Sequence, residues 1–117
     1  IRKLNTKGGL LAYLGTDDGK EISRRAQSGD EKARLVYEGM AYQTAKAIGA
    51  CAAVLKGNVR AIILTGGFAY DPLFTGWIAE RTSFLAEIVV MPGEDEQKAL
   101  SEAALRVLRG EEQLKVY

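Results

Sequence analysis

The chain has 117 residues, 47% hydrophobic and 26% charged, a composition typical of one modest globular domain. A net charge of +1 favours neither nucleic acid nor a membrane surface as a partner, and no apolar run is long enough to cross a bilayer. The absence of histidine excludes the commonest general base and zinc ligand, and the single cysteine, Cys51, excludes an intrachain disulfide and favours a reducing cytoplasm.

The first 29 residues predict a lead-in, a turn and a short helix. Residues 1–7 are basic, and we expect them to be a frayed lead-in. Residues 8–15 are apolar and bounded by glycines, which fits a compact buried turn better than a strand. Asp18, followed three residues later by Glu21, is typical of a capping box. We therefore expect a helix from this point to about residue 28, ended by Gly29.

Residues 30–57 predict a long helix that Asp30 begins and Gly57 ends. Because apolar residues also occur off its main stripe, we expect this helix to be apolar over much of its circumference and largely buried. Met40 and Cys51 are interpreted as core packing. The stripe itself consists of Ala33, Val36, Tyr37, Met40, Ala41, Thr44, Ile48, Ala52 and Leu55.

Residues 59–65 and 88–91 predict two adjacent parallel strands, since apolar runs without alternation suit strands covered on both faces. A helix over residues 72–83, begun by Asp71 and Pro72, connects them. A last helix is expected over residues 94–109. Two parallel strands make a small sheet. Parallel strands are normally buried among other strands, so we expect further strands to come from an upstream part of the protein or from a partner.

The double glycine Gly66-Gly67 follows the first predicted strand and is the most informative feature of the chain. Glycines let the backbone turn sharply and approach a ligand closely. Backbone N–H groups in such a loop form a natural seat for phosphate. The alternative is a tight strand-to-helix turn without a ligand, and the local sequence leaves both readings open.

Three stretches together resemble the C-terminal part of the butyrate kinases, within the acetate and propionate kinase family. They are residues 8–18 (GGLLAYLGTDD), residues 64–70 (LTGGFAY), and PGEDE at 92–96 running on to residue 110. The resemblance implies an α/β fold: the C-terminal part of the ribonuclease H-like domain shared by actin, sugar kinases and heat-shock chaperones. Residues 1–117 would be a single partial domain that lacks three antiparallel strands and the whole first domain.

The resemblance also implies a site for ATP or ADP. Gly66, Gly67 and Phe68 correspond to the adenosine motif of that fold, which holds the nucleotide phosphates by backbone N–H groups. The stretch that contains Thr16, Asp18 and Lys20 corresponds to an Asp-x-Arg turn lining the nucleotide pocket. Lysine stands here where arginine is usual, and an ammonium cannot reproduce the planar bidentate contacts of a guanidinium. For Asp18 a simple helix cap is the alternative.

A Mg²⁺ ion is implied by the same resemblance. Glu94, Asp95 and Glu96 lie where the family places a carboxylate that orients the Mg²⁺ of the nucleotide. Mg²⁺ takes oxygen ligands and usually needs only one or two carboxylates. An ordinary acidic helix N-terminus is the alternative for this triplet.

The function implied is the transfer of phosphate between ATP and a short-chain carboxylate such as butyrate. No catalytic residue is assigned in this chain, because the family's clamping arginines and histidine come from parts outside it. We therefore expect the isolated chain to be inactive. The partners implied are a nucleotide, a carboxylate bound through the missing domain, and a second copy or an upstream fragment. A non-catalytic assembly module that kept the fold is the alternative.

Overall fold

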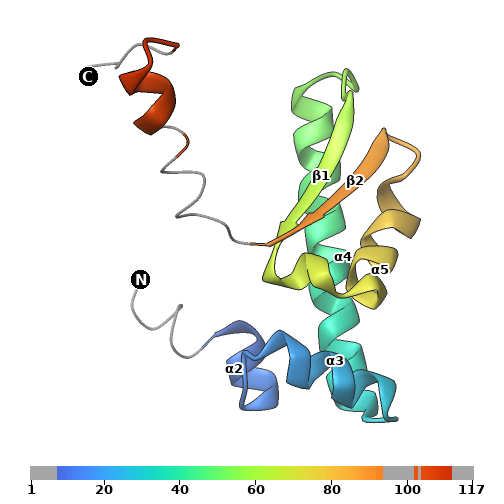
Figure 1. Ribbon diagram of the computed structural model, residues 1–117. Coiled ribbons are helices and arrows are strands. Elements are labelled where there is room, and N and C mark those ends of the chain that lie inside the picture. Colours follow the sequence, from blue (N-terminus) through green and yellow to red (C-terminus); the bar gives the residue numbers. More distant parts are fainter. Residues whose placement is uncertain (1–7, 94–101, 103, 112–117) are drawn as a thin grey trace.

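The computed structural model describes residues 8–93, 102 and 104–111 (Figure 1). From residue 19 to residue 92 the helices and strands follow the predicted order, with a short 3₁₀-helix, η1, between the first strand and the helix after it; an additional helix, α2, precedes them. Residues 104–108 are helical, and the rest of the predicted last helix lies largely outside the described residues. The elements are α2 (Gly9–Leu14), α3 (Gly19–Gln27), α4 (Glu31–Val54), β1 (Ala61–Gly66), η1 (Gly67–Tyr70), α5 (Pro72–Thr82) and β2 (Glu87–Pro92).

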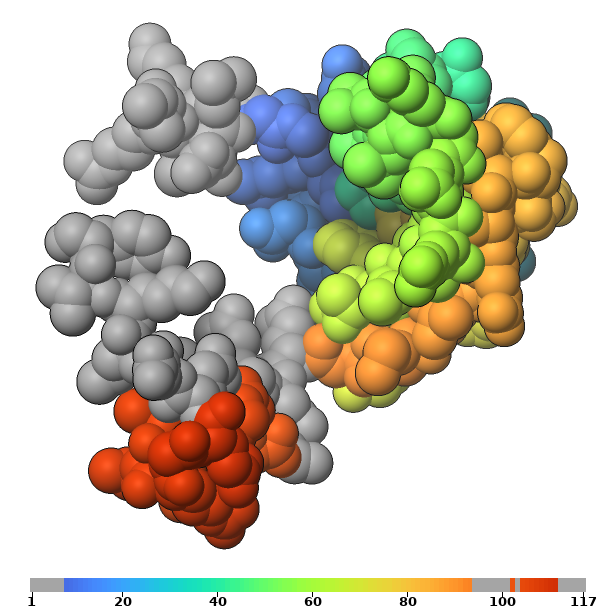
Figure 2. Space-filling view, turned by 90° about the horizontal axis from the view of Figure 1, so that it is seen from above, coloured from blue at the N-terminus to red at the C-terminus, as the bar shows by residue number. Residues whose placement is uncertain are grey.

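The sheet consists of β1 and β2, which pair in parallel from Ala61 opposite Glu87 to Gly66 opposite Pro92. Figure 2 shows the two strands side by side. The predicted parallel pair is therefore confirmed, with both strands displaced slightly from their predicted ends. Helix α5 connects them, as predicted, and begins at Pro72 with Asp71 as its cap.

Only one face of the sheet is covered by the described residues. Ile62 and Leu64 are buried in the core with residues of α3, α4 and α5. Ile63, between them, is 61% exposed, and Met91 of β2 is 58% exposed. The described helices gather on one side of the two strands, so the second cover that the strand composition predicts does not come from these residues, as the expectation of missing strands implied.

Helix α4 is begun by Asp30, whose side chain accepts a hydrogen bond from the Ala33 N–H, as predicted. It buries one face only. Leu35 is 73% and Val54 82% exposed, so the prediction of a largely buried helix is wrong. Cys51 is exposed, which also contradicts its interpretation as core packing. The residues of α4 that are buried are Ala33, Tyr37, Ala41, Ala45 and Ala52.

Residues 9–14 form helix α2 and not the expected turn. Gly15 closes this helix in the left-handed conformation at φ 74°, which glycine adopts without steric cost. None of the α2 residues is buried, although Leu10 and Leu14 pack against the core.

The predicted capping box of α3 is formed only in part. The Asp18 side chain accepts from the Lys20 N–H at 2.9 Å, so Asp18 is the cap. Its own N–H donates to Thr16 Oγ1 at 3.2 Å. Glu21 was expected to receive that bond, but its side chain faces Arg25 at 3.9 Å. The nearer threonine hydroxyl has replaced the glutamate.

The core lies between the sheet and helices α3, α4 and α5 and is built around Tyr37. The Tyr37 ring has no exposed surface, stacks on Phe74 at 5.0 Å between centroids, and meets the edge of Trp77 at 5.7 Å. These rings fix α4 against α5. None of the helices in the described part of the chain is long and apolar enough to span a membrane.

Candidate functional site

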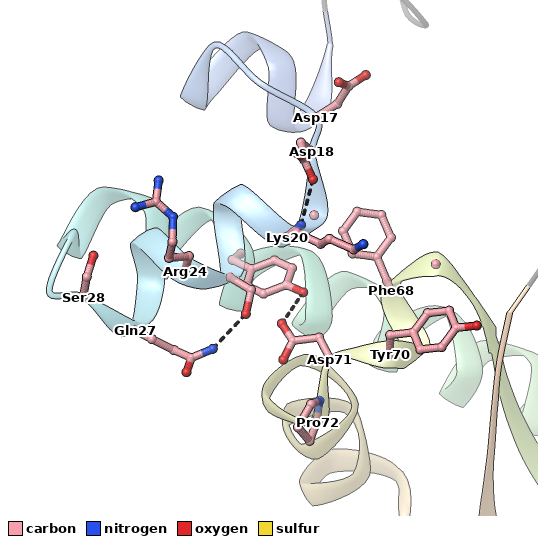
Figure 3. Close-up of a pocket in the computed structure, with 14 residues that line it drawn as sticks. Asp17, Asp18, Lys20, Arg24, Gln27, Ser28, Phe68, Tyr70, Asp71 and Pro72 are labelled. Carbon is pink, nitrogen blue, oxygen red and sulfur yellow. Dashed lines mark hydrogen bonds between the residues drawn. The ribbon is translucent and has the colours of Figure 1, made fainter.

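A pocket of about 1040 Å³ lies between the start of α3 on one side and η1 with the start of α5 on the other (Figure 3). Its walls come from two segments about fifty residues apart in the chain, at Asp18 and at Phe68. Tyr37 of α4 contributes to its floor.

The fold brings four of the predicted nucleotide-site residues to this pocket: Asp18, Lys20, Gly67 and Phe68. Thr16 does not line it and instead accepts the Asp18 N–H. The three acidic residues proposed for Mg²⁺, Glu94, Asp95 and Glu96, lie outside the described residues. Within residues 8–93, 102 and 104–111, no group of three or more metal-binding side chains was found.

Gly66 does not line the pocket and lies where β1 turns into η1. Its φ of 86° is one that side-chain-bearing residues rarely adopt, which explains a glycine at this turn. Its N–H donates to the Gly93 carbonyl at 3.2 Å. The Gly66 N–H is therefore engaged with the end of β2 and does not point freely toward a ligand.

The two walls of the pocket meet where Gly19 faces Phe68. A Cβ atom built on Gly19 would lie 2.7 Å from Phe68 Cε1, closer than real Cβ contacts. Gly19 thus allows the Phe68 ring to pack over the first turn of α3. The centroid of this half-buried ring also lies 5.5 Å from that of the Phe74 ring.

Charges of both signs surround the pocket. Lys20 and Arg24 are exposed and make no ion pair with any other described residue, and Figure 3 shows the Lys20 side chain extending toward Phe68. The carboxylates of Asp18 and Asp71 each cap a helix, accepting from the N–H of Lys20 and of Leu73. Lys20 and Arg24 are thus the cations with which an anionic ligand can pair, and they lie among three lining carboxylates, because Asp17 also faces the pocket.

Sequence reasoning missed the role of Tyr37 and Asp71 at this site. The Tyr37 hydroxyl donates to Asp71 Oδ2 at 2.8 Å, across 34 positions of sequence. Burial, followed by the Asp71 hydrogen bond and charge, raises the pKa of Tyr37 well above its ordinary range. Tyr37 was interpreted as a core residue and Asp71 as a cap. No local pattern relates two residues so far apart.

The outer face of α3 was also missed. Ser23, Arg24 and Gln27 line the pocket with Lys20, and Gln27 Nε2 donates to Ser23 Oγ at 2.9 Å. These residues follow Lys20 by three, four and seven positions, so helical periodicity could have found them once Lys20 was placed at a site.

Chemically, the pocket offers two exposed cations, an aromatic ring and a glycine at its rim. This combination suits an organic anion that carries a planar group. The chain has no histidine, and the described pocket residues include no activated nucleophile.

Comparison with known proteins gives one consistent result. The model of the acetokinase family matches residues 1–89. A probable butyrate kinase 2 of Caldanaerobacter subterraneus subsp. tengcongensis is 53% identical over 116 residues, which cover 99% of this chain and 33% of that protein. Butyrate kinases 2 and 1 of Clostridium acetobutylicum are 50% and 51% identical over 117 residues, which cover all of this chain and 33% of each. The chain thus spans about a third of the length of these relatives, and the resemblance stated from the sequence is confirmed.

Proposed function

The chain belongs to the acetokinase family, and from this membership we propose that it is the nucleotide-side part of a butyrate kinase-like enzyme. In the proposed reaction a carboxylate oxygen of a short-chain acid attacks the γ-phosphorus of ATP, and the bond to ADP breaks. The products are an acyl phosphate and ADP, and the reverse reaction uses the same site. The acid is bound by parts of the protein beyond these residues.

The observation that carries this proposal is the meeting of α3 and η1 around one pocket. Asp18 and Lys20 come from one predicted nucleotide motif, and Gly67 and Phe68 from the other. Small-molecule pockets commonly measure about 300–1000 Å³, so a cavity of about 1040 Å³ has room for a nucleotide.

Each of these residues has a proposed role that suits its chemistry. Gly67 is exposed at the rim and, without a side chain, lets a phosphate approach the backbone. Lys20 and Arg24 supply positive charge to the phosphates. The Phe68 ring gives an apolar surface to the base. Asp18 holds the start of α3 in place as its cap.

Mg²⁺ is proposed to arrive with the nucleotide. A nucleotide-bound Mg²⁺ keeps several waters and takes phosphate oxygens and one or two carboxylates as its other ligands. Glu94, Asp95 and Glu96 remain our proposal for the one or two carboxylates that orient it. Bound Mg²⁺ would neutralise charge on the phosphates during transfer.

Calorimetric titration of the 117-residue chain with Mg-ADP tests this proposal. We expect measurable binding by the natural chain. Gly67→Val should abolish it by blocking phosphate approach, whereas Gly39→Val is a matched control on an exposed position of α4 with open space around it. Lys20→Ala should cost less, about 0–1 kcal/mol, as is typical of an exposed ionic contact.

The same chain should show no acyl kinase turnover, because the part that binds the acid is absent. Phosphorylation of butyrate by the chain alone would contradict the proposal that other parts of the protein bind the acid. The alternative proposal, a non-catalytic assembly module, is favoured by the exposed apolar side chains of Ile63 and Met91. Failure of the natural chain to bind Mg-ADP would support that alternative.

A further inference from the structure

We infer that Tyr37 is a positioning residue of the pocket, whose hydroxyl holds η1, through Asp71, in the conformation that receives the ligand. The inference rests on the proposed function, since the ligand is taken to be a nucleotide. Tyr37 lies on α4, has no exposed surface, and donates to Asp71 Oδ2 at 2.8 Å. Figure 3 draws this bond at the wall of the pocket.

Asp71 joins the end of η1 to the start of α5. Its N–H donates to the Phe68 carbonyl at 3.1 Å, and its Oδ1 accepts from the Leu73 N–H at 3.0 Å. The Thr75 hydroxyl donates to its carbonyl at 3.1 Å. The Tyr37 hydroxyl donates to the other carboxylate oxygen, Oδ2, so both oxygens of Asp71 accept hydrogen bonds from within the protein.

The other end of η1 is held by a different element. Gly66 and Gly93 exchange two backbone hydrogen bonds, at 3.2 and 3.5 Å, which tie the start of η1 to the end of β2. The short helix between these two points carries Gly67 and Phe68. Its conformation is therefore set at both ends before any ligand arrives, and such preorganisation lowers the cost of binding.

The hydroxyl has a role that is separable from the ring. The Tyr37 ring packs on Phe74 at 5.0 Å and faces Phe68 at 6.2 Å, and a phenylalanine would keep both contacts. A buried hydroxyl needs a partner, and here the partner is a half-buried carboxylate that lines the pocket. Without the hydroxyl, Asp71 Oδ2 can turn toward water in the pocket and release the end of η1.

The test compares Tyr37→Phe with Tyr42→Phe, a matched change on the same helix at a side chain that is 48% exposed. Hydrogen exchange of the amides of residues 67–71 is measured on the ligand-free chain. We expect about tenfold faster exchange there in Tyr37→Phe, since local opening becomes easier, and no change in α4 or α5. Tyr42→Phe should leave all of these rates unchanged.

Titration with Mg-ADP supplies the second measurement. If the binding-competent turn is populated only about a fifth of the time without the hydroxyl, the Kd should rise about fivefold. Asp71→Asn keeps a helix cap. Adding Tyr37→Phe to Asp71→Asn should weaken binding less than Tyr37→Phe does in the natural chain, because the two residues act through one bond.

Three outcomes would overturn the inference: unchanged exchange at residues 67–71, equally faster exchange throughout α4 and α5, or faster exchange at 67–71 with unchanged Mg-ADP affinity. The second would show that the hydroxyl serves only global stability. Failure of the proposed function is recognised separately, because the natural chain would then not bind Mg-ADP, while the exchange experiment uses no nucleotide.

Discussion

Arg25 joins three neighbouring segments through one guanidinium. Its Nη2 lies 2.9 Å from Asp30 Oδ2, and its Nη1 donates to the Leu14 carbonyl at 3.2 Å. The Ala33 N–H, and then Arg25, lower the pKa of the Asp30 carboxyl below its ordinary value of 3.8. The start of α4 is therefore held by a carboxylate whose charge depends on pH.

The first prediction concerns that dependence. Because the pKa of Asp30 is lowered on folding, its contribution to stability is complete above the ordinary value of 3.8 and is lost as pH falls through the folded value. Asp30→Asn keeps a good cap but removes the charge. We expect the natural chain to be more stable than Asp30→Asn at neutral pH, with the difference shrinking below about pH 4.

Urea unfolding of both proteins across that pH range measures the effect. Glu31→Gln is a matched control, since it removes a neighbouring exposed carboxylate outside the Arg25 contact. A difference between the natural chain and Asp30→Asn that stays constant from neutral to acidic pH would contradict the prediction.

At the scale of whole elements, the contact between α3 and η1 depends on the absence of one side chain. Gly19 begins α3 directly beneath the Phe68 ring, whereas Gly39 lies in α4 with nothing within 4 Å of the Cβ position. The two helical glycines thus experience opposite surroundings. Helix propensity by itself favours alanine at both.

The second prediction is that Gly39→Ala and Gly19→Ala change stability in opposite directions. Gly39→Ala should raise the free energy of unfolding by roughly 0.5–1 kcal/mol, the usual gain inside a helix. Gly19→Ala should lower it by about 1–3 kcal/mol, because the new methyl group would overlap the Phe68 ring, and shifting that ring would cost its packing on Phe74 and Tyr37. Denaturant titration measures both, and an equal gain in the two variants would show that Phe68 moves aside freely.

At the scale of the molecule, the described residues leave an apolar sheet face and two strand edges open. Ile63 is 61% and Met91 58% exposed on that face, although the composition of both strands suits burial on two faces. Helix α4 adds an exposed Leu35. Open edges and apolar patches of this kind recruit partners.

The third prediction is that the chain associates with a second copy or with an upstream fragment of the same protein. Sedimentation velocity of the purified chain should show a concentration-dependent assembly, and Ile63→Lys should shift it toward the monomer. Leu35→Lys makes the matched change on α4. Comparison of the two variants shows whether the sheet or the helix forms the contact between the partners. A compact monomer at high concentration would contradict the prediction.

The sequence by itself determined the features that depend on a few neighbouring residues. Asp30 and the pair Asp71–Pro72 begin helices, and Gly29 and Gly57 follow helix ends, all where local chemistry predicted them. The parallel strand pair was also predictable, because two apolar runs separated by a helix have few other ways to pair. Caps and turns depend on residues a few positions apart, and this crossover depends on three consecutive elements.

Only the tertiary structure decided which faces are covered and which distant groups meet. Ile63 and Cys51 have apolar or small neighbours in the sequence, which predicted burial. Both are exposed because no described element packs over them. The hydrogen bond between Tyr37 and Asp71, and the approach of Gly19 to Phe68, join segments 34 and 49 positions apart. Burial and such contacts depend on the packing of separate elements, which no local pattern contains.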